Sequence, residues 1–258
     1  MTALDLRAEA RAISLRLPPP ALADLDPLGR AAAISTWRGR MVNEYVSARV
    51  FTALADQLGR ASLHTAAPRV HAMIAEERRH GALCAAVVEA LGGDAVADIP
   101  PLAAVPEHPD AGPLEAAIRN VLSISCLSET VAVALIDAER RTAGPPELSA
   151  LLAEILADEV QHARTGWRLL GDLAPDLDLP LRERLSDFLV LAFAHLRDHE
   201  LAHLPPRPSP SPAAEALGVC DGHAARALFF ATVEQVIVPG LQAHGLDAAG
   251  AWRAAQSA

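Results

Sequence analysis

Two helix breaks in this sequence each lie midway between a single glutamate and a Glu-x-x-His pair. One break follows Gly59 and the other is Gly144, and both also end a stretch of helical apolar spacing. In an antiparallel helical hairpin, two residues lie at the same height only when they are equidistant from the turn. We therefore expect two hairpins, each with two glutamates at one level. These glutamates are Glu44 and Glu77 in the first hairpin, and Glu129 and Glu159 in the second.

Apolar residues recur at helical spacing along most of the chain, between breaks at glycine and proline. The expected helices cover residues 31–58, 62–91, 113–142, 147–171, 180–203 and 222–242. Residues 94–112 are too rich in proline for a helix and form a long connection between the second and third helices. The chain is 51% hydrophobic but only 3% aromatic, which favours helices and excludes an all-β sandwich. We predict an all-α fold: a four-helix bundle with a long crossover between helices 2 and 3, plus additional C-terminal helices.

The domain organisation follows from the same breaks. Residues 1–30 form an N-terminal extension, residues 31–172 the four-helix bundle, and residues 173–258 the C-terminal helices packed on the bundle. The proline-rich segment 205–212 breaks the C-terminal part. A chain of this length builds one large core, so we expect a single domain overall.

Charge and cysteine usage exclude several classes of function. The formal net charge is −10, which argues against nucleic-acid binding. Cys84, Cys126 and Cys220 form no Cys-x-x-Cys pair, so we expect neither a disulfide framework nor a zinc ribbon. The N-terminus lacks the apolar segment of a signal peptide, and no uninterrupted apolar run approaches the roughly 18 residues of a membrane span. We expect a cytoplasmic protein that does not bind a membrane.

Each Glu-x-x-His pair can direct a carboxylate and an imidazole to one metal ion, because residues three apart lie on one face of a helix. The two hairpins would bring together four carboxylates and two imidazoles at mid-bundle. Buried carboxylates must be paired or bind metal, and two divalent cations would supply the balancing charge. Oxygen and imidazole ligands without thiolate suit iron or manganese. The expected ligands are Glu44, Glu77, His80, Glu129, Glu159 and His162.

The order Glu, Glu-x-x-His, Glu, Glu-x-x-His over residues 31–171 resembles the ferritin-like diiron-carboxylate superfamily. The resemblance implies two iron ions, with Mn/Fe or Mn/Mn centres as alternatives. In its oxygen-activating branch, an acid before the Glu-x-x-His glutamate orients a ligand histidine of a neighbouring helix. Glu76 and Asp158 occupy those positions, and Arg79 resembles an arginine found near such sites. Ordinary surface acids and a solvated arginine are the alternatives.

The resemblance implies a non-haem diiron oxidoreductase in which Glu44, Glu77, Glu129 and Glu159 take part in catalysis. We expect an oxidase or oxygenase of a small, apolar organic substrate, with Glu44 and Glu159 shifting between terminal and bridging binding. The residues one turn from the ligands are small or apolar and could line a substrate pocket, although tight helix packing would use the same residues. Dioxygen, the substrate and an electron donor are the expected partners, and a homodimer the expected assembly. A ferroxidase or iron-handling protein is the main alternative, and a metal-stabilised binding module a third.

Several polar residues lie outside this pattern. His195, His199 and His203 form a stripe at i, i+4 and i+8 with Glu200 among them, which could bind a surface metal or simply face solvent. Glu234 is an isolated acid in an apolar run, and its surroundings cannot be predicted from the pattern.

Overall fold

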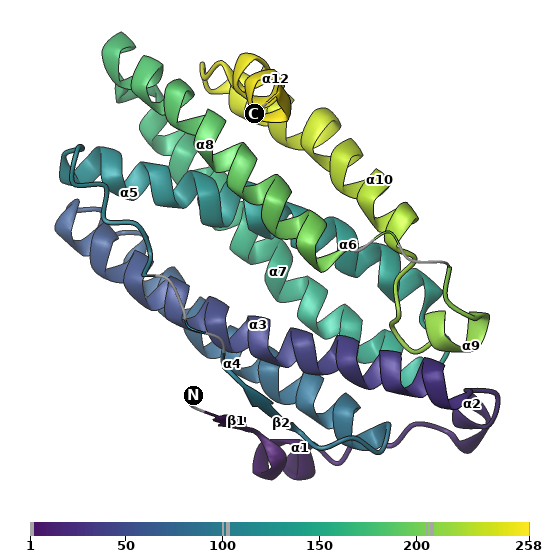
Figure 1. The fold of residues 1–258 in the computed structure, drawn as a ribbon. Coiled ribbons are helices and arrows are strands. Elements are labelled where there is room, and N and C mark those ends of the chain that lie inside the picture. Colours follow the sequence, from purple (N-terminus) through teal and green to yellow (C-terminus); the bar gives the residue numbers. More distant parts are fainter. Residues whose placement is uncertain (1–2, 100, 102–103, 205, 207–208, 258) are drawn as a thin grey trace.

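A computed structural model describes residues 3–99, 101, 104–204, 206 and 209–257 of the chain. The described chain is mostly helical (Figure 1). The long helical segments are α3 (Pro27–Arg60), α4 (Ala67–Ala90), α5 (Pro113–Val121) continued by the π-helical turn η1 (Leu122–Ser128) and α6 (Glu129–Thr142), α7 (Pro146–Leu173), α8 (Leu179–His203), and α10 (Gly222–Thr232) continued by η3 (Val233–Ile237) and α11 (Val238–Ala243). The shorter elements are β1 (Ala3–Asp5), α1 (Arg7–Ile13), α2 (Pro19–Ala23), β2 (Val96–Asp98), η2 (Ala174–Asp176), α9 (Pro212–Glu215) and α12 (Ala248–Ser257).

The predicted helices are present, with shifted boundaries that have local causes. The first begins at Pro27 rather than residue 31, because the Asp26 side chain caps it by accepting a hydrogen bond of 2.7 Å from the Gly29 amide. The second begins at Ala67 rather than residue 62. Ser62 adopts a left-handed backbone conformation, with φ 60°, which places it in the turn.

The long helices pack as two hairpins. Helix α3 packs against α4, and α6 packs against α7, while α4 also contacts α7 and thereby joins the hairpins (Figure 1). The predicted long connection runs between α4 and α5. Most of it is irregular, as expected, but residues Val96–Asp98 form a short strand.

Several short elements were not predicted from the sequence, although the chain is mostly helical as expected. Residues 3–5 pair antiparallel with residues 96–98, so the largely helical chain contains a two-stranded sheet, with Leu4 opposite Ala97. The N-terminal extension also contains α1, which packs on α4. A helix that the pattern did not predict, α12, packs against α8. The predicted break at 205–212 is partly outside the described residues, and α9 begins at Pro212.

The buried apolar side chains form two clusters, and the glutamate and histidine residues lie between them. On α3, α4 and α7, the helix passes from one cluster to the other at the level of these polar residues. The flanking pairs are Met41 and Phe51 on α3, Met73 and Leu83 on α4, and Ile155 and Leu170 on α7. A polar layer therefore crosses the interior of the hairpins.

Two helical segments, Pro113–Thr142 and Gly222–Ala243, are long and apolar enough to span a membrane by length and composition. The sequence has no uninterrupted apolar run of that length, but an 18-residue window within each segment has a high mean hydropathy, 1.7 and 1.3. Core helices of soluble proteins pass the same test, and both segments pack against other helices here, α6 against α7 and α10 against α6. The structure is therefore compatible with a soluble protein.

Candidate metal centre

The six predicted ligand residues lie together in the polar layer, in two overlapping groups. Within each group, one ligand atom from every residue lies within 4.8 Å of the others. We call them the His80 group, which contains Glu44, Glu77, His80 and Glu159, and the His162 group, which contains Glu77, Glu129, Glu159 and His162. Both groups contain Glu77 and Glu159, so the two shared carboxylates lie between the two imidazoles.

In the His80 group, the imidazole directs one ring nitrogen at two carboxylates. His80 Nδ1 lies 3.1 Å from Glu159 Oε1 and 3.6 Å from Glu44 Oε2. The His80 side chain is fully buried, and this nitrogen has no hydrogen-bond partner. An unpartnered buried nitrogen is costly unless something binds it, so this arrangement fits a metal ligand. The Glu44 side chain retains 15% of its accessible surface.

In the His162 group, the imidazole directs Nδ1 at three carboxylates. The nitrogen lies 3.0 Å from Glu77 Oε1, 3.1 Å from Glu159 Oε2 and 3.8 Å from Glu129 Oε2. All four residues of this group are buried. The centroid of the His162 ring lies 6.0 Å from that of His80. The two imidazoles are therefore neighbours within one cluster.

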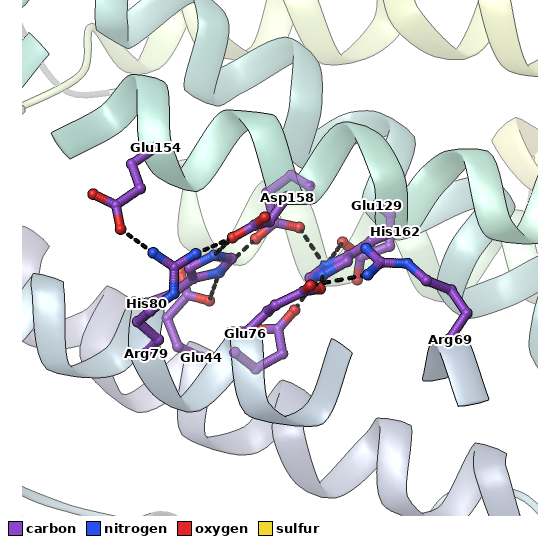
Figure 2. Close-up of polar contacts among 11 residues, drawn as sticks. Glu44, Arg69, Glu76, Arg79, His80, Glu129, Glu154, Asp158 and His162 are labelled. Atoms are coloured by element: carbon purple, nitrogen blue, oxygen red, sulfur yellow. Dashed lines mark hydrogen bonds and ion pairs between the residues drawn. The ribbon is translucent and has the colours of Figure 1, made fainter. Parts of the chain in front are cut away.

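The outward nitrogen of each imidazole contacts an acid on the facing helix (Figure 2). His80 Nε2 lies 3.0 Å from Asp158 Oδ2, and His162 Nε2 lies 2.9 Å from Glu76 Oε2. These are the two contacts that the resemblance implies for Glu76 and Asp158. A carboxylate on Nε2 holds the proton there and leaves the Nδ1 lone pair for a metal ion.

Each of these acids is in turn held by an arginine of α4. Arg79 donates to Asp158 and also to Glu154, and its side chain is 43% exposed (Figure 2). It is thus paired with two acids, although it lies at the surface. Arg69 donates to Glu76 over 2.9 Å. Sequence reasoning missed Arg69, although it precedes Glu76 by two helical turns and so lies on the same face of α4.

Without cations, burial and the neighbouring carboxylates disfavour the charged form of Glu77 and Glu129 in the cluster. Burial raises the pKa of Glu77 well above its ordinary value, and burial and the Glu159 carboxylate raise the pKa of Glu129 to about 8. Burial alone would lower the pKa of His80, but the neighbouring Glu159 and Glu44 carboxylates outweigh it and raise that pKa to about 11. Protons thus compensate the buried carboxylates in the metal-free protein, and divalent cations can replace them.

Close helix packing surrounds the His162 group. A Cβ atom added to Gly166 would lie 2.4 Å from Ser125 Cβ, so the glycine allows α7 to approach η1. Cys126, in η1, and Cys84, on α4, are buried thiols, as expected of small apolar side chains. At Gly166, the small residue serves tight packing, which is one of the two interpretations of the sequence pattern.

The other polar residues that the sequence analysis singled out do not belong to the cluster. Glu234 is exposed and accepts a hydrogen bond of 3.5 Å from Trp252 Nε1. His195, His199 and His203 are exposed on α8. None of these four residues belongs to the two ligand groups.

No protein-family model, curated protein or solved structure matches this chain. The functional inference therefore rests on the geometry and chemistry of the cluster.

Proposed function

We propose that this chain is a ferritin-like diiron protein that activates dioxygen to oxidise a small, apolar organic molecule. The observation that carries the proposal is the pair of ligand groups that share Glu77 and Glu159. Each group is completed by an imidazole whose other nitrogen contacts a carboxylate. The packing of α3 with α4 and of α6 with α7 supports a ferritin-like four-helix bundle around that centre.

The donor set fits two divalent ions. Four carboxylates balance two doubly charged cations, and the unpartnered His80 Nδ1 gains a bonding partner. The cluster has oxygen and imidazole donors without thiolate, which suits iron and manganese. Bound iron would supply electrons to dioxygen and oxidising power to the substrate.

The protein residues would have separate tasks in such a centre. His80 and His162 would bind through Nδ1, while Asp158 and Glu76 would fix the orientation of the rings. Glu77 and Glu159 reach both groups and would hold the ions together. Glu44 would be the carboxylate most able to change its binding mode, because its side chain keeps some contact with solvent.

We propose the same partners and location as the sequence suggests: a cytoplasmic homodimer that receives electrons from a separate donor. The net charge of −10 speaks against a nucleic-acid substrate. A soluble location is compatible with the two apolar helical segments, since both pack within the chain.

A ferroxidase is the second candidate, and the tight packing beside the His162 group favours it. The contact between Gly166 and Ser125 leaves no room for a side chain there, so small reactants such as ferrous ion and dioxygen suit this side best. An organic substrate would have to approach from the His80 side.

Anaerobic loading with Fe(II), followed by addition of dioxygen, distinguishes the two candidates. An oxidase or oxygenase retains about two irons per chain in a small oligomer and consumes dioxygen again when an electron donor is added. A storage protein instead accumulates hundreds of irons in a large shell, and that result would contradict the proposal. Failure of the wild-type chain to bind iron would contradict both candidates.

A further inference from the structure

A second group of metal-binding side chains lies on the exposed face of α8. His195, His199 and His203 are all exposed and follow one another at four-residue intervals, so they lie along one face of the helix. The ring centroids of His199 and His203 lie 4.4 Å apart, and those of His195 and His199 lie 6.2 Å apart. Neither the ligand groups nor the proposed function includes these residues.

The last two histidines form the sequence His-Glu-x-x-His at residues 199–203. On a helix, this spacing places two imidazoles on one face, where both can bind the same zinc ion. Two nitrogens on one tetrahedral zinc ion lie roughly 3.3 Å apart, given Zn–N bonds of about 2.0–2.1 Å. The rings of His199 and His203 are tilted by 45° and their centroids lie 4.4 Å apart, so rotation of the side chains can bring two nitrogens to that separation.

The hydrogen bonding of His203 and the lowered pKa of His199 favour metal binding. His203 Nδ1 lies 2.8 Å from the His199 carbonyl oxygen, which accepts its proton and leaves the Nε2 lone pair free. Partial desolvation of the ring and the neighbouring His203 and His195 lower the pKa of His199 to about 4, so its ring is neutral at physiological pH. Neutral imidazole is the form that binds metal, so no proton has to be displaced from His199.

The position on the helix also favours a cation. His203 is the last residue of α8, and the Leu204 amide donates to the Glu200 carbonyl over 2.9 Å at the helix end. The carbonyl end of a helix carries partial negative charge, which stabilises a cation bound in the last turn.

We propose that His199 and His203 form a zinc site on the surface of α8, separate from the buried cluster, with water completing the coordination. Imidazole also suits Cu²⁺ and Ni²⁺, which would bind to the same pair. This inference concerns metal binding alone and does not depend on the function of the buried cluster.

Equilibrium dialysis of the full chain against Zn²⁺ tests the site by counting ions per chain. The double variant His199→Gln, His203→Gln is expected to bind one zinc ion per chain fewer than the wild type. The number of zinc ions bound by the buried cluster should not change. His71→Gln is the matched control, because His71 is also exposed and its Nδ1 also contacts a helix carbonyl, that of Ala67 at 2.8 Å, but it has no histidine one turn away. His71→Gln should retain the wild-type count.

Single variants separate loss of the ligand from loss of structure. His203→Gln alone should lose the zinc with an unchanged circular dichroism spectrum, since the side chain is exposed. His195→Gln should keep it. An unchanged zinc count in the double variant, or loss in His195→Gln but not in His203→Gln, would overturn the assignment.

Discussion

The His80 group and the His162 group contain the same types of ligand, but their surroundings differ. The His80 group includes Glu44, whose side chain is 15% exposed, and its outer acid is held by the half-exposed Arg79. All four residues of the His162 group are buried. For the proposed centre, we therefore expect ions and reactants to exchange through the His80 side, and the His162 side to hold its ion more firmly.

The largest effect is expected where both groups are broken at once. Glu77→Ala removes a carboxylate that belongs to both groups, so we expect it to abolish binding of both ions, measured as iron per chain after anaerobic loading. Circular dichroism of the metal-free variant checks that it is folded.

Glu183→Ala is the control for this experiment. Glu183 is an exposed glutamate of α8, outside both groups, and its removal should leave the iron count unchanged. Two irons per chain in folded Glu77→Ala would refute the site.

The next largest effect distinguishes the two groups. Glu44 belongs only to the His80 group and Glu129 only to the His162 group, so Glu44→Ala and Glu129→Ala should each lose one ion. The ion that Glu44→Ala keeps should dissociate more slowly than the ion that Glu129→Ala keeps, in a chelator competition assay. Equal dissociation rates would remove the proposed difference between the two sides.

The sequence predicted the centre of the molecule well, for two physical reasons. Helix periodicity sets residues three apart on one face, and equidistance from a turn sets the height of residues in a hairpin. Those two rules bring the six glutamate and histidine residues together without knowledge of packing, and their role as metal ligands stays a prediction. The acids on the outer nitrogens were predicted as well, because they directly precede the glutamates, but only through the resemblance.

Other features could not be read from the sequence. Strands of three residues, such as Ala3–Asp5 and Val96–Asp98, are too short to show an alternating pattern. The π-helical turn over residues 122–128 replaces the α-helical hydrogen bonds by i→i+5 bonds, and no residue in that apolar stretch signals the change. The pairing of Arg69 with Glu76 depends on how two long side chains lie in the folded protein.

A moderate effect is expected from the acids that hold the two imidazoles. Asp158→Asn should weaken the ion of the His80 group, and Glu76→Gln that of the His162 group, each by about 10–100-fold in affinity. The amides retain size and remove charge, so folding should be preserved. An anaerobic Fe(II) titration measures both, and affinities within about twofold of the wild type would show that these acids do not support the ligands.

Two glycines test the packing of the two sides. Gly166→Ala should destabilise the protein by about 1–3 kcal/mol, because the new Cβ would lie 2.4 Å from Ser125 Cβ. Gly81→Ala, beside the His80 group, should be neutral or stabilising, since its Cβ would lie 3.6 Å from Glu44 Cβ, an ordinary contact, and alanine favours helix. Urea denaturation of both variants measures the difference, and equal stabilities would contradict the tighter packing around His162.

The last expected effect is a pH dependence of the metal-free protein. Glu129, with a pKa raised to about 8, and His80, with a pKa raised to about 11, hold protons in the folded state that the unfolded chain releases at lower pH. Stability should therefore fall as the pH rises from 6.5 to 8, because the folded state binds more protons throughout that range. Thermal denaturation at several pH values measures the slope, and Glu129→Gln should reduce it. A stability that rises over this range would be the contrary result.

Anomalous diffraction at the iron edge, from crystals of the iron-loaded protein, tests the central claim most directly. The account predicts two peaks, roughly 3.5–4 Å apart. One should lie beside His80 Nδ1 and Glu44, the other beside His162 Nδ1 and Glu129, with Glu77 and Glu159 between them. A single peak, or no peak within the polar layer of a crystal that contains iron, would contradict a two-metal centre in this protein.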